Sequence, residues 1–293
     1  MPFYSVKIRR MSRKEGYFMH MADALVSPAV AGAMYAASTA AAAYSVKRVK
    51  HEDDIKKIPL MGVMGAFVFT AQMINFTIPG TGSSGHLCGG VMATALLGPY
   101  AGFLTMIGVL LIQCLLFADG GLLALGCNVW NMAFYGCFVG YYLIWRPMTR
   151  RRLSGGRILA GSLIASMLTL QLGAFSVAVE TLLSGVTKLP FSAFVAVMQP
   201  IHLAIGFVEG AITAAVLLFV YQARPELLDD KGKSGRQNRF SYKRTIAVLG
   251  VFAVITGAGL SLAASSYPDG LEWSIQQVAK AEEIEAEGGG VYA

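Results

Sequence analysis

Two histidines lie in sequence contexts that favour metal binding. His20 directly follows Met19, and His86 ends a stretch rich in glycine and serine that begins at Pro79. Neutral imidazole is a common ligand for nickel, copper and zinc. The glycines let the backbone near His86 come close to another segment of the chain. The two histidines therefore predict a shared nitrogen site, provided that the fold brings them together.

The chemistry of this site depends on which residue is the first. If the chain begins at Met19, its α-amine, the backbone nitrogen of His20 and the His20 imidazole can close two fused chelate rings on one metal ion. The His86 imidazole would complete a plane of nitrogens, a geometry that suits Ni(II) or Cu(II) better than tetrahedral Zn(II). His51 and His202 are weaker candidates, because His51 lies in a charged segment and we expect His202 to pack on a neighbouring helix.

The segment before Met19 is hypothesised to be a misassigned leader. Residues 1–18 carry five basic side chains, Lys7, Arg9, Arg10, Arg13 and Lys14. Lys14-Glu15-Gly16 can be encoded by codons that contain a bacterial ribosome-binding sequence, with Tyr17-Phe18 as the spacer before a start at Met19. A short targeting extension is the alternative, but the segment has no apolar core. We therefore expect the mature chain to begin Met19-His20.

The elements that must position these residues are membrane helices. Of the 293 residues, 55% are apolar and 14% are charged, whereas a soluble domain carries about 25% charged residues. The net charge of +7 comes from short basic clusters between apolar runs, a pattern that sets membrane orientation rather than binding nucleic acid. A membrane helix needs about 20 apolar residues. The uncharged runs are Ala24–Val46, Ile58–Gly85, Leu87–Ala118, Gly120–Trp145, Ile158–Val179, Leu189–Val208 and Thr245–Pro268.

Basic clusters predict the orientation of these runs. Three clusters are expected on the cytoplasmic side: Lys47, Arg48, Lys50, Lys56 and Lys57; Arg146, Arg150, Arg151, Arg152 and Arg157; and Lys231, Lys233, Arg236, Arg239, Lys243 and Arg244. The stretch Thr77–His86 has no basic residue and is expected outside. Since His86 is expected outside and Arg146 inside, Leu87–Ala118 must cross the membrane twice or not at all. We interpret it as a helical hairpin broken at Gly98-Pro99, whose short first arm is either re-entrant or extended back through the glycines. The N-terminus, His86 and the segment after Pro268 all fall on the external side.

The predicted fold is therefore an all-α integral membrane protein, with a seven-helix core bundle and one C-terminal transmembrane helix. The predicted domains are a leader (1–18), a metal-binding membrane core (19–222), a basic cytoplasmic linker (223–244), and a transmembrane helix with an external segment (245–293).

At several motifs the sequence resembles the CbiM/NikM family, the substrate-binding components of energy-coupling-factor transporters for cobalt and nickel. The motifs are Met19-His20, Ser83-Ser84-Gly85-His86, Leu97-Gly98-Pro99, Ala118-Asp119-Gly120-Gly121-Leu122, Gly126-Cys127-Asn128-Val129-Trp130-Asn131-Met132-Ala133, and His202–Ala214. The resemblance covers about 19–222 and lies slightly closer to the nickel-type members. It implies a subunit of an ATP-driven uptake transporter in the cell (inner) membrane, with Ni(II) or Co(II) as cargo and no organic cofactor.

The resemblance also implies roles for individual residues. The metal ligands would be Met19, His20 and His86, the same set that coordination chemistry favours. A ligating imidazole needs a partner on its other ring nitrogen. Candidates for this role are Asp23, Ser84, Asn128 and Asn131. For each of them, helix capping or interhelical hydrogen bonding is an equally weighted alternative.

The C-terminal part resembles a second family segment. Tyr267-Pro268-Asp269-Gly270-Leu271-Glu272-Trp273 is similar to the PDGLE motif of the small CbiN/NikN subunits, here fused after one helix. Those subunits usually have a second helix beyond the motif, whereas this chain ends in the polar, acidic stretch Ala281–Ala293. An ordinary external turn is the alternative interpretation.

Partners are expected in separate chains. The sequence contains no Walker A motif for ATP binding, so the resemblance implies a separate coupling membrane subunit and separate ATP-binding subunits. Ala29, Ala33, Ala37 and Ala41 repeat every four residues and allow close helix approach. This alanine face is a candidate docking surface for the coupling subunit, although internal packing is slightly favoured.

Two other function classes stay open. Glu180 and Glu209 lie at or near the ends of spans, and intramembrane carboxylates can couple transport to ions, so a secondary transporter is the first alternative. A membrane enzyme using His86 with Cys88, or His202 with Glu209, is less favoured because no nucleophile–base–orienter set is visible. The four cysteines, Cys88, Cys114, Cys127 and Cys137, have no C-x-x-C spacing and are interpreted as buried thiols.

Overall fold

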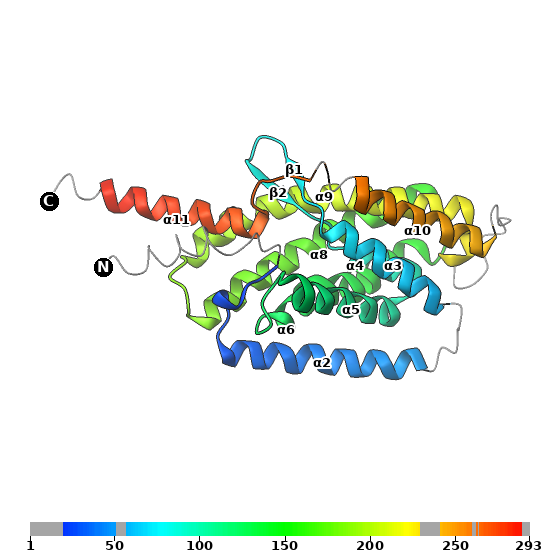
Figure 1. The fold of residues 1–293 in the computed structure, drawn as a ribbon, viewed down its shortest axis with the longest axis horizontal. Helices are drawn as coiled ribbons and strands as arrows, with labels where there is room; N and C mark the ends of the chain where they lie inside the picture. The colour runs from blue at the N-terminus through cyan, green and yellow to red at the C-terminus, as the bar shows by residue number, and fades with distance from the viewer. Residues whose placement is uncertain (1–19, 51–56, 229–240, 260–261, 263, 289–293) are drawn as a thin grey trace.

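The computed structural model describes residues 20–50, 57–228, 241–259, 262 and 264–288. The chain is mostly helical, with one two-stranded sheet among the described residues, and its long helices run roughly parallel or antiparallel to one another (Figure 1). The helical segments are η1 (Asp23–Leu25), α2 (Pro28–Lys50), α3 (Lys57–Gln72), α4 (Gly90–Leu97), α5 (Pro99–Phe117), α6 (Leu125–Asn128), η2 (Val129–Trp145, a π-helix), α7 (Arg146–Thr149), α8 (Gly155–Ser184), α9 (Phe191–Ala223), η3 (Pro225–Leu227), α10 (Tyr242–Gly259) and α11 (Gly270–Gly288).

The apolar helices agree with a membrane protein. Three of the described helices are long and apolar enough to cross a bilayer, namely α5, α8 and α9, and α3 is a shorter apolar helix. Many large apolar side chains point away from the bundle, Leu116, Leu143 and Leu183 among them. Because an outward apolar surface of this kind is favourable only in lipid, the all-α membrane class holds.

The break predicted at Gly98-Pro99 is present, between α4 and α5, which pack against each other. That Leu87–Ala118 crosses the membrane twice stays a prediction. Gly98 has φ of +81°, and Pro99 is the first residue of α5, where its missing N–H costs no hydrogen bond. The first arm, α4, has 8 residues, all of them buried, so its helix rises only about 12 Å. The segment 86–89 before it is non-helical, and its residues are buried or half-buried.

Several expected boundaries differ from those observed. The run Ile58–Gly85 is helical only to Gln72, and its second half forms a β-hairpin of β1 (Phe76–Ile78) and β2 (Ser83–Gly85), with Thr77 opposite Ser84. Gly80 and Gly82 take positive φ in the turn. The run from Gly120 becomes helical only at Leu125, because residues 118–121 form a tight turn against the N-terminal segment.

A helix also follows the PDGLE motif, where the sequence alone indicated only a polar tail. The helix α11 begins inside the motif at Gly270, and its apolar residues Leu271, Ile275 and Val278 lie on one face that packs against the core. Asp269 accepts a hydrogen bond from the Glu272 N–H at 2.7 Å and so caps the helix. The apolar spacing of one face, rather than overall hydrophobicity, explains why this segment is helical.

The bundle has two distinct ends. The β-hairpin, the start of α2 and the start of α11 lie at one end, and the C-terminal end of α2 and the start of α10 lie at the other (Figure 1). Basic side chains mark the second end: Arg48 lies over the Tyr100 ring at 5.3 Å, and Arg224 lies over the Tyr242 ring at 5.9 Å. The first end holds the candidate site.

Candidate metal centre

His20 and His86 lie side by side in the structure. Their ring centroids are 5.4 Å apart with an interplanar angle of 86°. They line one cavity of about 90 Å³, several times the about 10–15 Å³ that one water molecule needs by the same measure. The two histidines are 66 positions apart in sequence (86 − 20) and come from the N-terminal segment and the loop after β2.

The N-terminal segment is bound to the core by backbone and side-chain hydrogen bonds. The Asn128 side chain accepts from the Met21 N–H at 3.0 Å and donates to the Met21 carbonyl at 3.1 Å. Asp23 accepts from the Ala124 N–H at 2.9 Å, and the Gly121 N–H donates to the Met21 carbonyl. Together these contacts position His20, which is only 3% exposed.

Glycines at 120 and 121 make this close approach possible. A Cβ at Gly121 would lie 1.7 Å from an Asp23 carboxylate oxygen, and a Cβ at Gly120 would lie 3.0 Å from the Cβ of His20. Gly120 also has φ of +80°. A larger residue at either position would displace the segment that carries His20.

Each imidazole has a partner on one ring nitrogen. The His20 Nδ1 lies 3.3 Å from the Asp119 Oδ2, whereas its Nε2 is buried with no hydrogen-bond partner among the described residues. The His86 Nδ1 donates to the Leu87 carbonyl at 3.0 Å. The contact at His86 is of the kind that usually holds a metal-ligating imidazole.

The loop after His86 is anchored from α9. The Glu209 carboxylate accepts from the Cys88 N–H at 2.8 Å and from the Gly89 N–H at 3.0 Å. Since these N–H groups precede the first turn of α4, Glu209 caps that helix. The Gln72 side chain adds a hydrogen bond to the Cys88 carbonyl at 2.7 Å.

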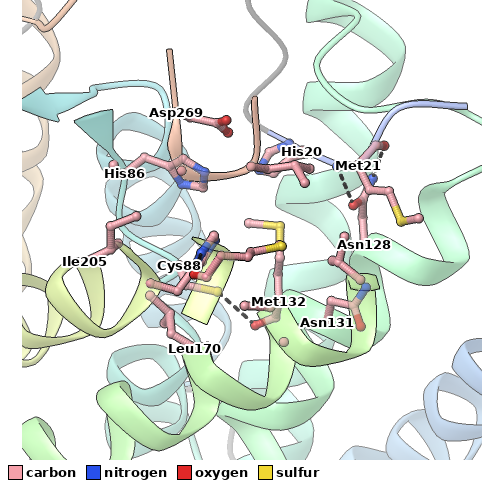
Figure 2. A pocket seen from close by; sticks show the side chains of 18 residues that line it. His20, Met21, His86, Cys88, Asn128, Asn131, Met132, Leu170, Ile205 and Asp269 are labelled. Atoms are coloured by element: carbon pink, nitrogen blue, oxygen red, sulfur yellow. Dashed lines mark hydrogen bonds between the residues drawn. The ribbon is translucent and has the colours of Figure 1, made fainter. Parts of the chain in front are cut away.

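The predicted residues fall into different places around this cavity. His20, His86, Asn128 and Asn131 line it (Figure 2). Asn131 donates to Glu180 at 2.7 Å. Asp23 and Ser84 bind backbone groups elsewhere, Ser84 through the carbonyls of Tyr267 and Pro268. Met19 lies outside the described residues.

Sequence reasoning missed or undervalued three residues at the site: two that line the cavity, His202 and Asp269, and one that contacts His20, Asp119. Asp119 is the partner of His20, although the sequence presented it only as part of a turn motif. His202, expected simply to pack on a helix, lines the cavity, and its Nδ1 lies 2.8 Å from the Met198 carbonyl. Asp269 of the PDGLE motif also lines it and is 4% exposed. No local pattern links these residues, because they come from three separate segments.

One carboxylate, that of Asp269, lines the cavity. Burial raises the pKa of Asp269 to about 6, an effect that the nearby His86 and His20 imidazoles partly oppose. Within the described residues no three His, Cys, Asp or Glu side chains form a metal-binding cluster. A metal site here therefore needs further ligands besides these side chains, such as backbone or terminal nitrogens.

The alanine face of α2 does not pack uniformly inward. Ala29 and Ala33 are exposed, and Ala37 and Ala41 are half-buried. The buried face of α2 follows Ala31, Ser38 and Ser45 instead, with Ser38 donating to the Gly126 carbonyl at 2.8 Å. The expectation of internal packing therefore fails at Ala29 and Ala33.

The comparisons with known proteins agree on one family. The family described as the cobalt uptake substrate-specific transmembrane region, CbiM, matches residues 20–227, and the PDGLE domain matches residues 243–293. A putative fused nickel transport protein, NikMN, of Archaeoglobus fulgidus is 40% identical over 80% of this chain and 76% of its own.

Other relatives carry similar names. A cobalt transport protein, CbiM, of Geobacter sulfurreducens is 30% identical over 89% of this chain and 78% of its own. A crystal structure of a truncated transition metal transporter superposes with a TM-score of 0.61 and 32% identity, covering 69% of this chain and 98% of that one. These relatives are transport proteins, and the chain is a membrane transport component rather than an enzyme. The chain thus belongs to the CbiM family of cobalt and nickel transport proteins and carries a PDGLE domain fused at its C-terminal end.

Proposed function

We propose that the chain is the substrate-binding membrane subunit of an ATP-driven uptake transporter for Ni(II) or Co(II). The observation that carries the proposal is the meeting of His20 and His86 in one cavity, 5.4 Å apart between ring centroids. The buried Nε2 of His20 has no hydrogen-bond partner among the described residues, a costly arrangement that rotation of the imidazole on metal binding would relieve. The names of the relatives supply the cargo, nickel or cobalt.

The proposed ligands are four nitrogens in a plane: the Met19 α-amine, the His20 backbone nitrogen, the His20 imidazole and the His86 Nε2. This set requires Met19 to be the first residue of the mature chain, with residues 1–18 absent. The amine must be free and the imidazoles neutral. Planar nitrogen ligation accommodates Ni(II) well.

Closing the chelate requires a change at His20. The chelate ring that includes the His20 backbone nitrogen can close only through Nδ1, and Nδ1 lies beside Asp119 in the structure. Rotation of the imidazole about Cβ–Cγ exchanges Nδ1 with Cδ2 and brings Nε2 to the side of Asp119. Asp119 would then hold the non-ligating nitrogen, the usual carboxylate–histidine–metal arrangement.

The proposed orientation places the site on the external face of the cell (inner) membrane. The basic residues near Arg48, Arg146 and Arg224 lie at the opposite end of the bundle, which is expected to be cytoplasmic. The proposed topology has seven crossings in 19–222, a basic linker at 223–244, and an eighth crossing in 245–293 before the external PDGLE segment.

The proposed partners are a coupling membrane subunit and ATP-binding subunits in separate chains. The exposed Ala29 and Ala33 on α2 support the alanine face as the docking surface, because small residues allow close helix approach in lipid. Uptake should then require the ATP-binding subunits, whereas a secondary carrier would not.

Nickel binding by purified protein tests the ligand set. Protein that begins at Met19, verified by intact mass, should bind Ni(II), and His20→Ala, His86→Ala or one residue added before Met19 should abolish binding while the protein still inserts. His202→Ala is the matched control, because it removes an imidazole from the same cavity but not from the proposed plane. Unchanged binding by the extended protein, or equal losses in the His202 and His86 variants, would show that the ligand set is wrong.

A further inference from the structure

The fused C-terminal segment is bound to the loop that carries His86. The Ser84 N–H donates to the Pro268 carbonyl at 2.8 Å, and the Ser84 hydroxyl donates to the Tyr267 carbonyl at 2.8 Å. Ser84 belongs to β2 and lies two residues before His86. The segment before α11 therefore adds to the edge of the β-hairpin directly beside the histidine.

The next residues of the segment form one wall of the cavity. Asp269, Gly270 and Leu271 all line it. A Cβ at Gly270 would lie 3.1 Å from the His202 Cε1, so this glycine lets the segment pack onto that imidazole. Leu271 belongs to the same buried apolar cluster as Met21, the residue that follows His20.

The Asp269 carboxylate lies in this wall close to both proposed ligating imidazoles. Figure 2 shows it above His86 and His20 in that view. One of its oxygens, Oδ1, caps α11 by accepting from the Glu272 N–H. The carboxylate is almost fully buried although it lies in a loop, with a relative exposure of 4%.

Carboxylates beside the proposed site lower the cost of holding a cation there. A dication held by a neutral amine, two neutral imidazoles and one deprotonated amide keeps a net charge of +1. Burying an uncompensated charge in a cavity is costly. Asp119 beside His20 supplies one negative charge, which offsets this +1, and Asp269 supplies a second one from another part of the chain, so the buried surroundings favour a cation.

We infer that Asp269 is a positioning residue of the metal site, whose carboxylate retains the bound dication electrostatically from outside the plane of nitrogens. The fused segment is then part of the cargo-binding cavity and not merely a second transmembrane anchor. This inference rests on the proposed function.

Two substitutions separate the charge of Asp269 from its role as a helix cap. Asp269→Asn removes the charge but keeps a good cap, whereas Asp269→Glu keeps the charge but caps poorly because its side chain is longer. We expect Asp269→Asn to weaken Ni(II) binding by about 10- to 100-fold, as loss of a residue that supports metal ligands commonly does, and Asp269→Glu to weaken it less. Titration of full-length protein with Ni(II) gives the affinities, and thermal unfolding without metal measures the stability lost when the helix cap is weakened.

Controls distinguish the possible failures. Glu272→Gln removes a neighbouring carboxylate that does not line the cavity, and binding should stay within about twofold of the original. Unchanged binding by Asp269→Asn, a greater loss in Asp269→Glu, or an equal loss in Glu272→Gln would overturn the inference and leave the proposed function standing. Original protein that fails to bind Ni(II), or His86→Ala protein that binds it fully, would overturn the proposed function itself.

Discussion

At the scale of single residues, the site depends on what holds the two imidazoles. His86 is oriented by its own neighbour through the Leu87 carbonyl, whereas His20 is oriented by Asp119 from a different segment. A backbone carbonyl survives any side-chain substitution, but a carboxylate does not. Asp119 is therefore the more vulnerable of the two supports.

Replacing Asp119 by Asn should weaken Ni(II) binding by about 10- to 100-fold, because the His20 imidazole loses its anionic partner. Asp23→Asn is the control: Asp23 is exposed and binds the Ala124 N–H, a bond that an amide oxygen can also accept. Calorimetric titration compares the two affinities. Equal affinities for the two variants would contradict a special role for Asp119.

A second residue-scale prediction concerns Glu209. If its role is to cap α4, Glu209→Gln leaves a buried N–H poorly satisfied and should lower stability by about 1–3 kcal/mol, while metal uptake per folded protein is retained. Glu226→Gln is the control, since Glu226 is 45% exposed and pairs at the surface with Arg224, where an ion pair contributes little.

The measurements for Glu209 are thermal unfolding and uptake normalised to folded protein. Abolished uptake with unchanged stability would instead favour the ion-coupled carrier, in which an intramembrane carboxylate takes part in transport.

At the scale of elements, the site is built where three segments meet: the N-terminal segment, the turn at residues 118–121 and the loop between β2 and α4. Residues 20–22, the described residues before η1, have no regular structure, and the segment depends on its contacts with the turn. The turn can approach it only because both Gly120 and Gly121 lack a side chain.

Gly121→Ala should therefore displace the N-terminal segment. The new methyl group would overlap the Asp23 carboxylate, and overpacking of this kind costs about 1–3 kcal/mol. We expect lower stability and a marked loss of Ni(II) affinity. Gly62→Ala in α3 is the matched control, because nothing lies within 4 Å of its added Cβ. Full affinity in the Gly121 variant would show that this contact does not position His20.

At the scale of the whole molecule, one end of the bundle gathers the candidate site and the other gathers basic side chains. The β-hairpin, the first described residues and the PDGLE segment share the first end. At the second end, three arginines lie over tyrosine rings: Arg48 over Tyr100, Arg146 over Tyr142 and Arg224 over Tyr242. This division supports the proposed external site and cytoplasmic basic loops.

Labelling of intact cells tests that orientation. Pro79→Cys in the β-hairpin turn should react with a membrane-impermeant maleimide, and Arg151→Cys before α8 should not, although both positions are exposed in the structure. The unsubstituted chain gives the background, since its four cysteines are buried or half-buried. Labelling of Arg151→Cys alone would reverse the orientation.

The sequence by itself determined the class of the protein and its candidate ligands. Long uncharged runs require lipid as the solvent, and the break at Gly98-Pro99 follows from the backbone preferences of those two residues. His20 and His86 could be selected as candidate metal ligands because the ability of imidazole to bind a metal is a property of the residue type. The partnership between them was a conditional prediction that needed the fold.

Only the tertiary structure decided which groups surround those ligands. His202 and Asp269 line the cavity, and Asp119 contacts His20; the three come from separate segments, and no local pattern encodes contacts between positions so far apart. The same reason explains why Ser84 pairs with the PDGLE segment and Glu209 caps α4. Hydrogen-bond partners depend on where groups lie in space. The packing of the whole bundle determines those positions, and the spacing of residues along the chain does not.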